Sequence, residues 1–228
     1  MSLSHGKFVI PLLVAIAAVL LSMFGRDLLE PPSDAAAPAA SERIIDGVAF
    51  PGEIKAAGAK QLLIGGGTRS KWGFKVYALG IYSDPKLIKS LKKKYPGDAS
   101  GTNLSKDFGE GKQARTLLLR FRRGVASADI SEALGEALVD KIGEEKSSQF
   151  SQFVLDVVGS DRLEKGSEVY ISCKGERLWS SLAEGKEALA IGVKGLCAAI
   201  FEVYLGSGPV SPQAKDGFEK GFADLTMS

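Results

Sequence analysis

Apolar and polar residues alternate in several short segments after residue 43, and this period of two is typical of strands with one buried face. We predict strands in the segments IIDGVAFP (44–51), KQLLIGGG (60–67), FKVYALGIYSD (74–84) and ARTLLLRFRRGV (114–125). The second segment ends in three glycines, where the missing side chains let the backbone turn or approach another group closely. A later pair of segments, 167–175 and 177–183, predicts a β-hairpin.

Other segments repeat their apolar residues every three or four positions, which predicts helices. The clearest is 130–143, where one stripe holds Ile130, Leu134, Leu138 and Ile142 behind capping residues 127–129. Further helices are predicted at 85–95, 148–158, 187–206 and 211–225, and a surface loop at 95–111. Strands thus come first, helices follow, and a hairpin and two helices close the chain. This order predicts an α+β domain over residues 44–228, with helices on one side of an antiparallel sheet.

The N-terminal part has a different character. Residues 8–24 form an uncharged, apolar run near the shortest length that spans a bilayer as a helix. Small residues that would mark signal cleavage begin only about ten residues beyond the run, so an uncleaved anchor is favoured over a removed signal. We therefore predict an anchor or signal segment at 1–30 and a stiff Pro/Ala-rich linker at 31–43. The protein is then expected at a membrane of the secretory or an organellar route, such as a plastid or the endoplasmic reticulum, rather than free in the cytosol.

Composition narrows the chemistry. The net charge of +2 gives no reason to expect a nucleic-acid partner. The single histidine, His5, lies in the N-terminal segment, which argues against a Ser-His-Asp triad or a histidine-ligated metal in the folded part. The two cysteines, Cys173 and Cys197, have no metal-binding spacing; small buried apolar residues are favoured, and a disulfide is the alternative.

Two segments point to a family. The first is GGGTRSKWGFKVYALGIY (65–82), which holds an arginine after a glycine run and a tyrosine eight residues later. The second is LCAAIFEVYLGSGPVSPQAK (196–215), a helix with a Leu-Gly and Val-Ser-Pro ending. Both resemble segments of chalcone isomerase-fold proteins. DGVAFP (46–51) precedes them and RRGVASADISEAL (122–134) stands between them, in the expected order. The resemblance extends over about residues 44–225.

The resemblance implies an open-faced β-sandwich, in which a ligand cleft lies between a long antiparallel sheet and a layer of helices. The family contains true isomerases and non-catalytic relatives that bind fatty acids. The isomerases combine an arginine with a strand threonine, a tyrosine and an asparagine near the mid-chain helix, and a hydroxyl on the C-terminal helix. Here Arg69 matches the arginine, but Tyr77 and Val203 stand at the threonine and hydroxyl positions, and 124–138 has neither Tyr nor Asn.

The remaining pair, Arg69 and Tyr77, implies a non-catalytic protein without a cofactor that holds a fatty-acid carboxylate. A guanidinium takes a carboxylate in a bidentate contact, and a phenol donates a third hydrogen bond. Trp72 and Phe74 are expected in the core or at the rim, and Tyr82 on the opposite strand face.

Three alternatives stay open. Arg69 could form a structural ion pair with a carboxylate such as Glu202. It could instead stabilise an enolate in the cyclisation of a chalcone. The fold could also serve as a ligand-free interaction scaffold.

Overall fold

The computed structural model describes residues 41–96, 102–184, 186 and 188–227. The predicted anchor at 1–30 and most of the linker at 31–43 lie outside these residues. None of the helices in the described ranges is long and apolar enough to cross a membrane.

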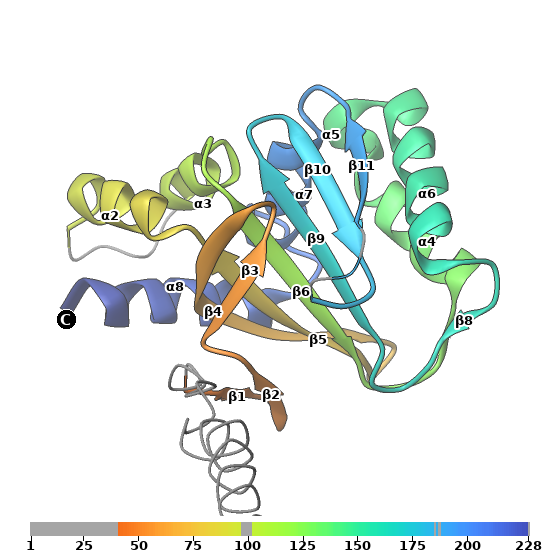
Figure 1. The fold of residues 1–228 in the computed structure, drawn as a ribbon, viewed down its shortest axis with the longest axis horizontal. Coiled ribbons are helices and arrows are strands. Elements are labelled where there is room, and N and C mark those ends of the chain that lie inside the picture. The colour runs from red at the N-terminus through yellow and green to blue at the C-terminus, as the bar shows by residue number, and fades with distance from the viewer. Residues whose placement is uncertain (1–40, 97–101, 185, 187, 228) are drawn as a thin grey trace, which may run out of the picture. The chain divides into compact units, whose positions relative to one another are not determined.

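A seven-stranded antiparallel sheet forms the centre of the fold, in the order β11-β10-β9-β6-β5-β4-β3 (Figure 1). Its strands are β3 (Glu53–Ala56), β4 (Ala59–Lys71), β5 (Phe74–Ser83), β6 (Arg115–Phe121), β9 (Glu168–Lys174), β10 (Arg177–Ser181) and β11 (Leu189–Gly192). Two small antiparallel sheets of two strands each accompany it, β1 (Arg43–Ile45) with β2 (Val48–Phe50), and β7 (Val125–Ala126) with β8 (Arg162–Leu163).

The helices cover one face of this sheet. They are α2 (Pro85–Lys94), α3 (Thr102–Gly109), α4 (Ser127–Glu136), α5 (Val139–Ile142), α6 (Glu144–Val158), α7 (Leu196–Leu205) and α8 (Pro212–Met227). Alternate residues of β5 show the two faces: Tyr77 belongs to the large core under the helices, whereas Tyr82 packs with Phe50 of β2 in a smaller core on the other face. The predicted α+β class and open-faced sandwich are therefore confirmed.

Several predicted elements have different bounds. The segment 44–51 is a hairpin, because Asp46 and Gly47 take positive φ angles of 47° and 78° and turn the chain between β1 and β2. The predicted surface loop 95–111 contains α3, and its side chains Leu104 and Phe108 are buried. The predicted helix 130–143 divides into α4 and α5.

The predicted helix 187–206 begins with a strand. Residues 189–192 pair with β10 as β11, and only residues from Leu196 onward are helical. Strand β3, which no pattern indicated, forms a hairpin with β4.

A disulfide joins Cys173 of β9 to Cys197 of α7. Both side chains are buried, as predicted, but the favoured expectation of two unbonded cysteines is wrong. Because the two residues are 24 positions apart in the sequence, the bond closes a loop and restricts the unfolded chain. It also fixes α7 against the sheet.

The three glycines at 65–67 do not end a strand; they lie in the middle of β4, where α8 packs directly on the backbone. A Cβ atom added to Gly65 would lie 1.9 Å from the carbonyl oxygen of Gly217 in α8. A Cβ atom on Gly217 would in turn lie 1.9 Å from the carbonyl oxygen of Gly66. The close approach expected for this run is therefore confirmed, and its partner is a helix.

This contact predicts that Gly217→Ala destabilises the protein. Alanine favours a helix by up to about 1 kcal/mol over glycine, but here its methyl group meets backbone atoms that cannot rotate away. Overpacking should prevail and lower the free energy of unfolding by about 1–3 kcal/mol, measured by urea denaturation. Gly192→Ala is the matched control, because a Cβ atom there would have nothing within 4 Å. Equal stability of the two variants would contradict the contact.

Candidate functional site

Arg69 and Tyr77 are directly opposite each other on β4 and β5. Residues paired in this way point to the same face of a sheet and lie close enough to act together. Here that face carries the helices, since Tyr77 belongs to the core beneath them. The structure therefore brings together the two residues that the sequence singled out.

A second phenol completes the group. The hydroxyl of Tyr204, on α7, lies 2.7 Å from the hydroxyl of Tyr77 in a hydrogen bond that either can donate. The tyrosines are 3% and 1% exposed. Sequence reasoning missed Tyr204, because it examined Val203 for a hydroxyl and the next residue along the same helix provides one.

A cleft of about 630 Å³ opens beside these residues. Its walls come from the β4–β5 turn, the segment that follows β6, α4, α7 and Val210. Arg69, Tyr77 and Tyr204 line it together with apolar side chains: Val76, Val125, Ile130, Leu134, Val203 and Val210. This size and mixture are typical of small-molecule sites, in which a few polar groups orient a ligand against an apolar wall.

Arg69 has no carboxylate partner among the described residues. Its guanidinium donates to the carbonyl oxygen of the neighbouring Ser70 at 2.8 Å. Glu202, the proposed structural partner, accepts instead from Lys141 at 2.9 Å. The alternative of an Arg69–Glu202 pair is therefore wrong, and the half-buried cation is left beside the cleft.

Both phenols stay protonated at neutral pH. Burial raises the pKa of Tyr77, although its hydrogen bond to Tyr204 and the charge of Arg69 act in the opposite direction. Burial also raises the pKa of Tyr204 well above the ordinary value, and the nearby Tyr77 adds to this shift. A neutral phenol pair has two protons and needs only one for its internal hydrogen bond. One hydroxyl therefore remains able to donate outward.

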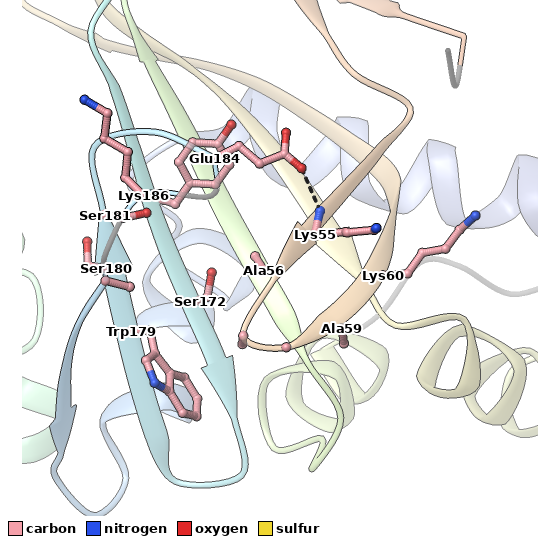
Figure 2. Close-up of a pocket in the computed structure, with 14 residues that line it drawn as sticks. Lys55, Ala56, Ala59, Lys60, Ser172, Trp179, Ser180, Ser181, Glu184 and Lys186 are labelled. Atoms are coloured by element: carbon pink, nitrogen blue, oxygen red, sulfur yellow. Dashed lines mark hydrogen bonds between the residues drawn. The ribbon is translucent and has the colours of Figure 1, made fainter. Parts of the chain in front are cut away.

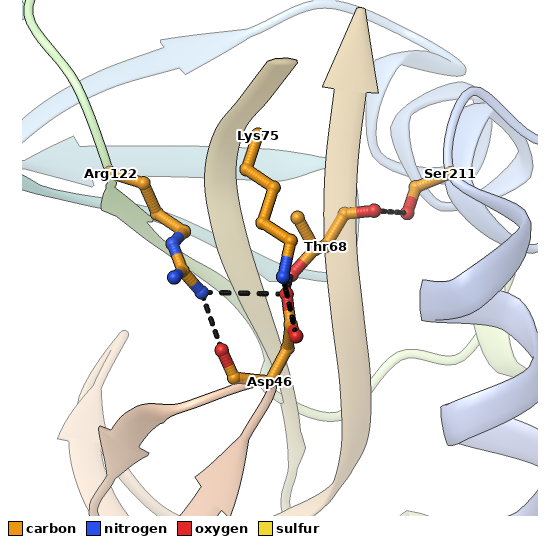
Figure 3. Close-up of polar contacts among 5 residues, drawn as sticks. All are labelled: Asp46, Thr68, Lys75, Arg122 and Ser211. Atoms are coloured by element: carbon orange, nitrogen blue, oxygen red, sulfur yellow. Dashed lines mark hydrogen bonds and ion pairs between the residues drawn. The ribbon is translucent and has the colours of Figure 1, made fainter. Parts of the chain in front are cut away.

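A polar network on the opposite sheet face supports the strands that carry Arg69 and Tyr77 (Figure 3). The carboxylate of Asp46 accepts from Thr68 of β4 at 2.7 Å and from Lys75 of β5 at 2.8 Å. Arg122 lies 3.4 Å from the same carboxylate. The hydrogen bonds from Lys75 and Thr68 lower the pKa of Asp46, so the carboxylate remains charged.

The same network reaches α8. The hydroxyl of Ser211 donates to the carbonyl oxygen of Thr68 at 2.9 Å and accepts from the amide of Ala214 in the first turn of the helix. Thr68 thus connects the hairpin β1–β2 on one face to the start of α8 on the other. Its neighbour Arg69 is held in register by both contacts.

Comparison with known proteins identifies the fold family. A family model described as chalcone isomerase-like matches residues 42–218, which is most of the chain. The chain belongs to the chalcone isomerase-like family. A curated member, chalcone isomerase-like protein 1 of Humulus lupulus, is 27% identical over 173 residues, covering 70% of this chain and 79% of that protein.

A solved member has the same fold. The crystal structure of an Arabidopsis thaliana fatty-acid binding protein superposes with a TM-score of 0.66 and covers 82% of this chain and all of that one. The identity of 20% is low enough that the likeness shows the shared fold alone. The resemblance stated from residues 65–82 and 196–215 is confirmed, while the roles of Arg69 and Tyr77 stay a prediction.

A second pocket lies on the other face of the sheet, because its lining includes Tyr170 of the smaller core whereas Tyr77 belongs to the large one. Figure 2 shows the residues that line it. It has a volume of about 410 Å³ and is lined by residues of the β3–β4 hairpin, β9 and β10. Its Lys55 amide donates to the Glu184 carboxylate at 2.8 Å, and Trp179 stands at its side. Within the described ranges, no group of side chains is arranged to hold a metal ion.

The buried phenols predict a loss of stability in alkali. Burial raises the pKa values of Tyr77, Tyr82, Tyr170 and Tyr204 above the ordinary value of 10.0. Above pH 10 the unfolded chain therefore loses protons that the folded chain keeps. The contribution of each buried phenol to the free energy of unfolding is complete below pH 10. It is lost as the pH rises through the pKa that the phenol has in the folded protein. Each group should lower the free energy of unfolding by about 1.4 kcal/mol per pH unit in that window.

Urea denaturation across this pH range, with phenolate absorbance as a second readout, checks the expectation. Tyr77→Phe removes one group and should make the fall with pH less steep. A flat dependence above pH 10 would show that the phenols titrate as they do in the unfolded chain.

Proposed function

We propose that this protein binds a long-chain fatty acid without transforming it, with the carboxylate held by Arg69 and Tyr77 and the acyl chain in the cleft. The observation that carries the proposal is the cation of Arg69 without a carboxylate partner in the described structure, beside a buried protonated phenol pair. A carboxylate ligand would satisfy both: the guanidinium provides charge and two parallel donors, and the spare phenol proton provides one more.

The hydrogen bond between the two phenols determines which hydroxyl can donate to the ligand. If Tyr204 donates to the Tyr77 oxygen, the Tyr77 proton is free for the ligand, and the bond at 2.7 Å orients the ring. Tyr204 then acts as a positioning residue. Its place on α7, which the disulfide ties to β9, keeps the two hydroxyls in register.

The apolar wall supports an acyl tail. Val76, Ile130, Leu134 and Val203 contribute side chains from three elements around the cleft. Burial stabilises the complex by roughly 0.8 kcal/mol for each methylene removed from water. The solved relative from Arabidopsis is a fatty-acid binding protein, and the common fold makes this ligand class the natural one to test.

The isomerase alternative is less well supported by the residues in the cleft. Of the groups that isomerases use, Arg69 is present, and Tyr204 adds a hydroxyl on the C-terminal helix. The walls formed by residues 123–137 contain neither tyrosine nor asparagine. Stabilisation of an enolate would then depend on Arg69 and a phenol that is already hydrogen-bonded.

Calorimetric titration of the full-length protein with dodecanoate and with dodecanol tests the proposal. Arg69→Gln should weaken dodecanoate binding about 10- to 100-fold, since a charge-assisted hydrogen bond contributes about 1.5–3 kcal/mol. It should leave dodecanol binding unchanged, because the alcohol has no charge to lose. Arg177→Gln is the matched control, an arginine on β10 outside the cleft that packs on Trp179.

Two outcomes would overturn the proposal. Equal dodecanoate affinities of the wild type and Arg69→Gln would show that Arg69 does not hold the carboxylate. Conversion of a chalcone to a flavanone by the wild type, lost in Arg69→Gln, would establish the isomerase instead.

We also propose that residues 8–24 remain attached and hold the protein at a membrane. The apolar run and the distant small residues support this interpretation. The full-length chain should stay with membranes after an alkaline carbonate wash, and Ile16→Asp with Leu20→Asp should release it, because each charge costs about 2.5–3.5 kcal/mol at the centre of a membrane helix. Recovery of a chain that lacks this segment would show a cleaved signal.

A further inference from the structure

The turn between β4 and β5 exposes two large aromatic side chains at the edge of the cleft. Trp72 is 86% exposed and Phe74 is 62% exposed, and both line the cleft. Because the fold buries neither ring, a large apolar area remains in contact with water. Trp72 and Gly73 form a two-residue turn with φ angles of 51° and 80°.

This turn is unfavourable for tryptophan. Two positive φ angles belong to a type of hairpin turn for which Asn-Gly is the preferred pair. A bulky residue at the first position is a conformational outlier, and a ring that is 86% exposed gains little here from packing. Stability therefore does not explain why tryptophan stands at position 72, and we attribute its presence to a contact that the protein surface makes.

Each exposed ring carries a cation. The Lys71 ammonium lies 4.8 Å from the centre of the Trp72 ring, and the Arg123 guanidinium lies 5.3 Å from that of Phe74. No carboxylate in the described parts of the chain pairs with either cation. Lys75 and Arg122 close by are different, because both form ion pairs with Asp46.

Charge divides the rim of the cleft. Arg69, Lys71 and Arg123 come from the β4–β5 hairpin and the segment after β6, whereas the acidic lining residues, Asp129, Glu132 and Glu136, come from α4. A fourth lining cation, Arg162 of β8, is paired with Glu164 at 3.1 Å. Aromatic rings accompanied by cations fit the boundary of an anionic bilayer, where the ring enters the headgroup layer and the cation meets lipid phosphates.

We propose that this tip, formed by Lys71, Trp72, Phe74 and Arg123, docks on the surface of an anionic lipid bilayer. Docking would place the basic edge of the cleft against the membrane. If the protein binds fatty acid as proposed above, the ligand could pass between bilayer and cleft without crossing bulk water. The docking is inferred from the exposed rings and cations of the tip alone, whereas the transfer of ligand rests on the proposed function.

The two tryptophans of the chain make the test specific to the site. In full-length Trp179→Phe protein, Trp72 is the single tryptophan, so its emission reports the position of the tip even if another segment holds the protein to the vesicle. With vesicles of phosphatidylcholine and phosphatidylglycerol, we expect a blue shift and quenching by brominated lipid. Vesicles of phosphatidylcholine alone should quench less.

Two variants serve as controls. Trp72→Asn keeps only Trp179 and creates the preferred Asn-Gly turn, so it should fold with an unchanged or higher melting temperature and show no lipid quenching. Lys71→Gln with Arg123→Gln, in the Trp179→Phe background, should lower the docked-to-undocked ratio about 25-fold, since each cation contributes about fivefold.

Several results would overturn the proposal. These are unquenched Trp72 emission with anionic vesicles, equal quenching with neutral ones, or equal quenching of Trp179. Quenching of Trp72 by a single-stranded oligonucleotide without vesicles would assign the tip to nucleic acid instead. Dodecanoate binding without vesicles is measured on the same protein. Loss of docking with intact dodecanoate binding rejects only the docking surface, and the reverse result rejects only the fatty-acid proposal.

Discussion

The antiparallel pairing of β4 with β5 determines what each face of the sheet can hold. Because successive residues alternate between faces, the pairing of Arg69 with Tyr77 and of Thr68 with Ala78 sends one pair toward the helices and the other away from them. The first pair lines the cleft. The second lies where Thr68 reaches Asp46. A slip of one residue would exchange the two faces and separate the cation from the phenol pair.

Two different contacts hold the helical layer on the sheet. Near the middle of β4, Gly65 and Gly217 let α8 lie against the strand backbone, so the distance between helix and sheet is determined by main-chain atoms. On β9, the disulfide from Cys173 fixes α7, which carries Tyr204. The cleft lies beyond both constraints along the strands, at the end of the sheet where Arg69 pairs with Tyr77 and Tyr77 with Phe121. There the β4–β5 turn, α4 and α7 surround a volume of about 630 Å³.

The polar groups of the cleft suit a carboxylate ligand in their protonation as well as in their position. Burial keeps Tyr77 and Tyr204 neutral, and Arg69 contributes a guanidinium to the lining of the same cleft. In the proposed function, a carboxylate ligand would meet a cation and a hydrogen-bond donor there rather than a second negative charge. Groups that would repel it, the acidic residues of α4, come from a different element of the lining.

Local patterns predicted most elements correctly because strands and helices depend on residues close in sequence. Alternation located β5, β6 and the β9–β10 hairpin, and the stripe beginning at Ile130 located α4. Errors arose where distant contacts decided the outcome. Residues 102–109 are helical because Phe108 packs on Phe201 and Phe218, about a hundred residues away. Residues 189–192 are a strand because the edge of β10 was free to pair with them.

The sequence by itself determined the α+β class, the family and the two candidate residues Arg69 and Tyr77, since these depend on periodicity and on short motifs. Only the tertiary structure decided that Tyr204 joins Tyr77, that Cys173 bonds to Cys197, and that Glu202 is not the partner of Arg69. Each of these contacts joins residues on elements far apart in the chain. Their distances depend on how helices pack on the sheet, and no local pattern of apolar and polar residues contains that information.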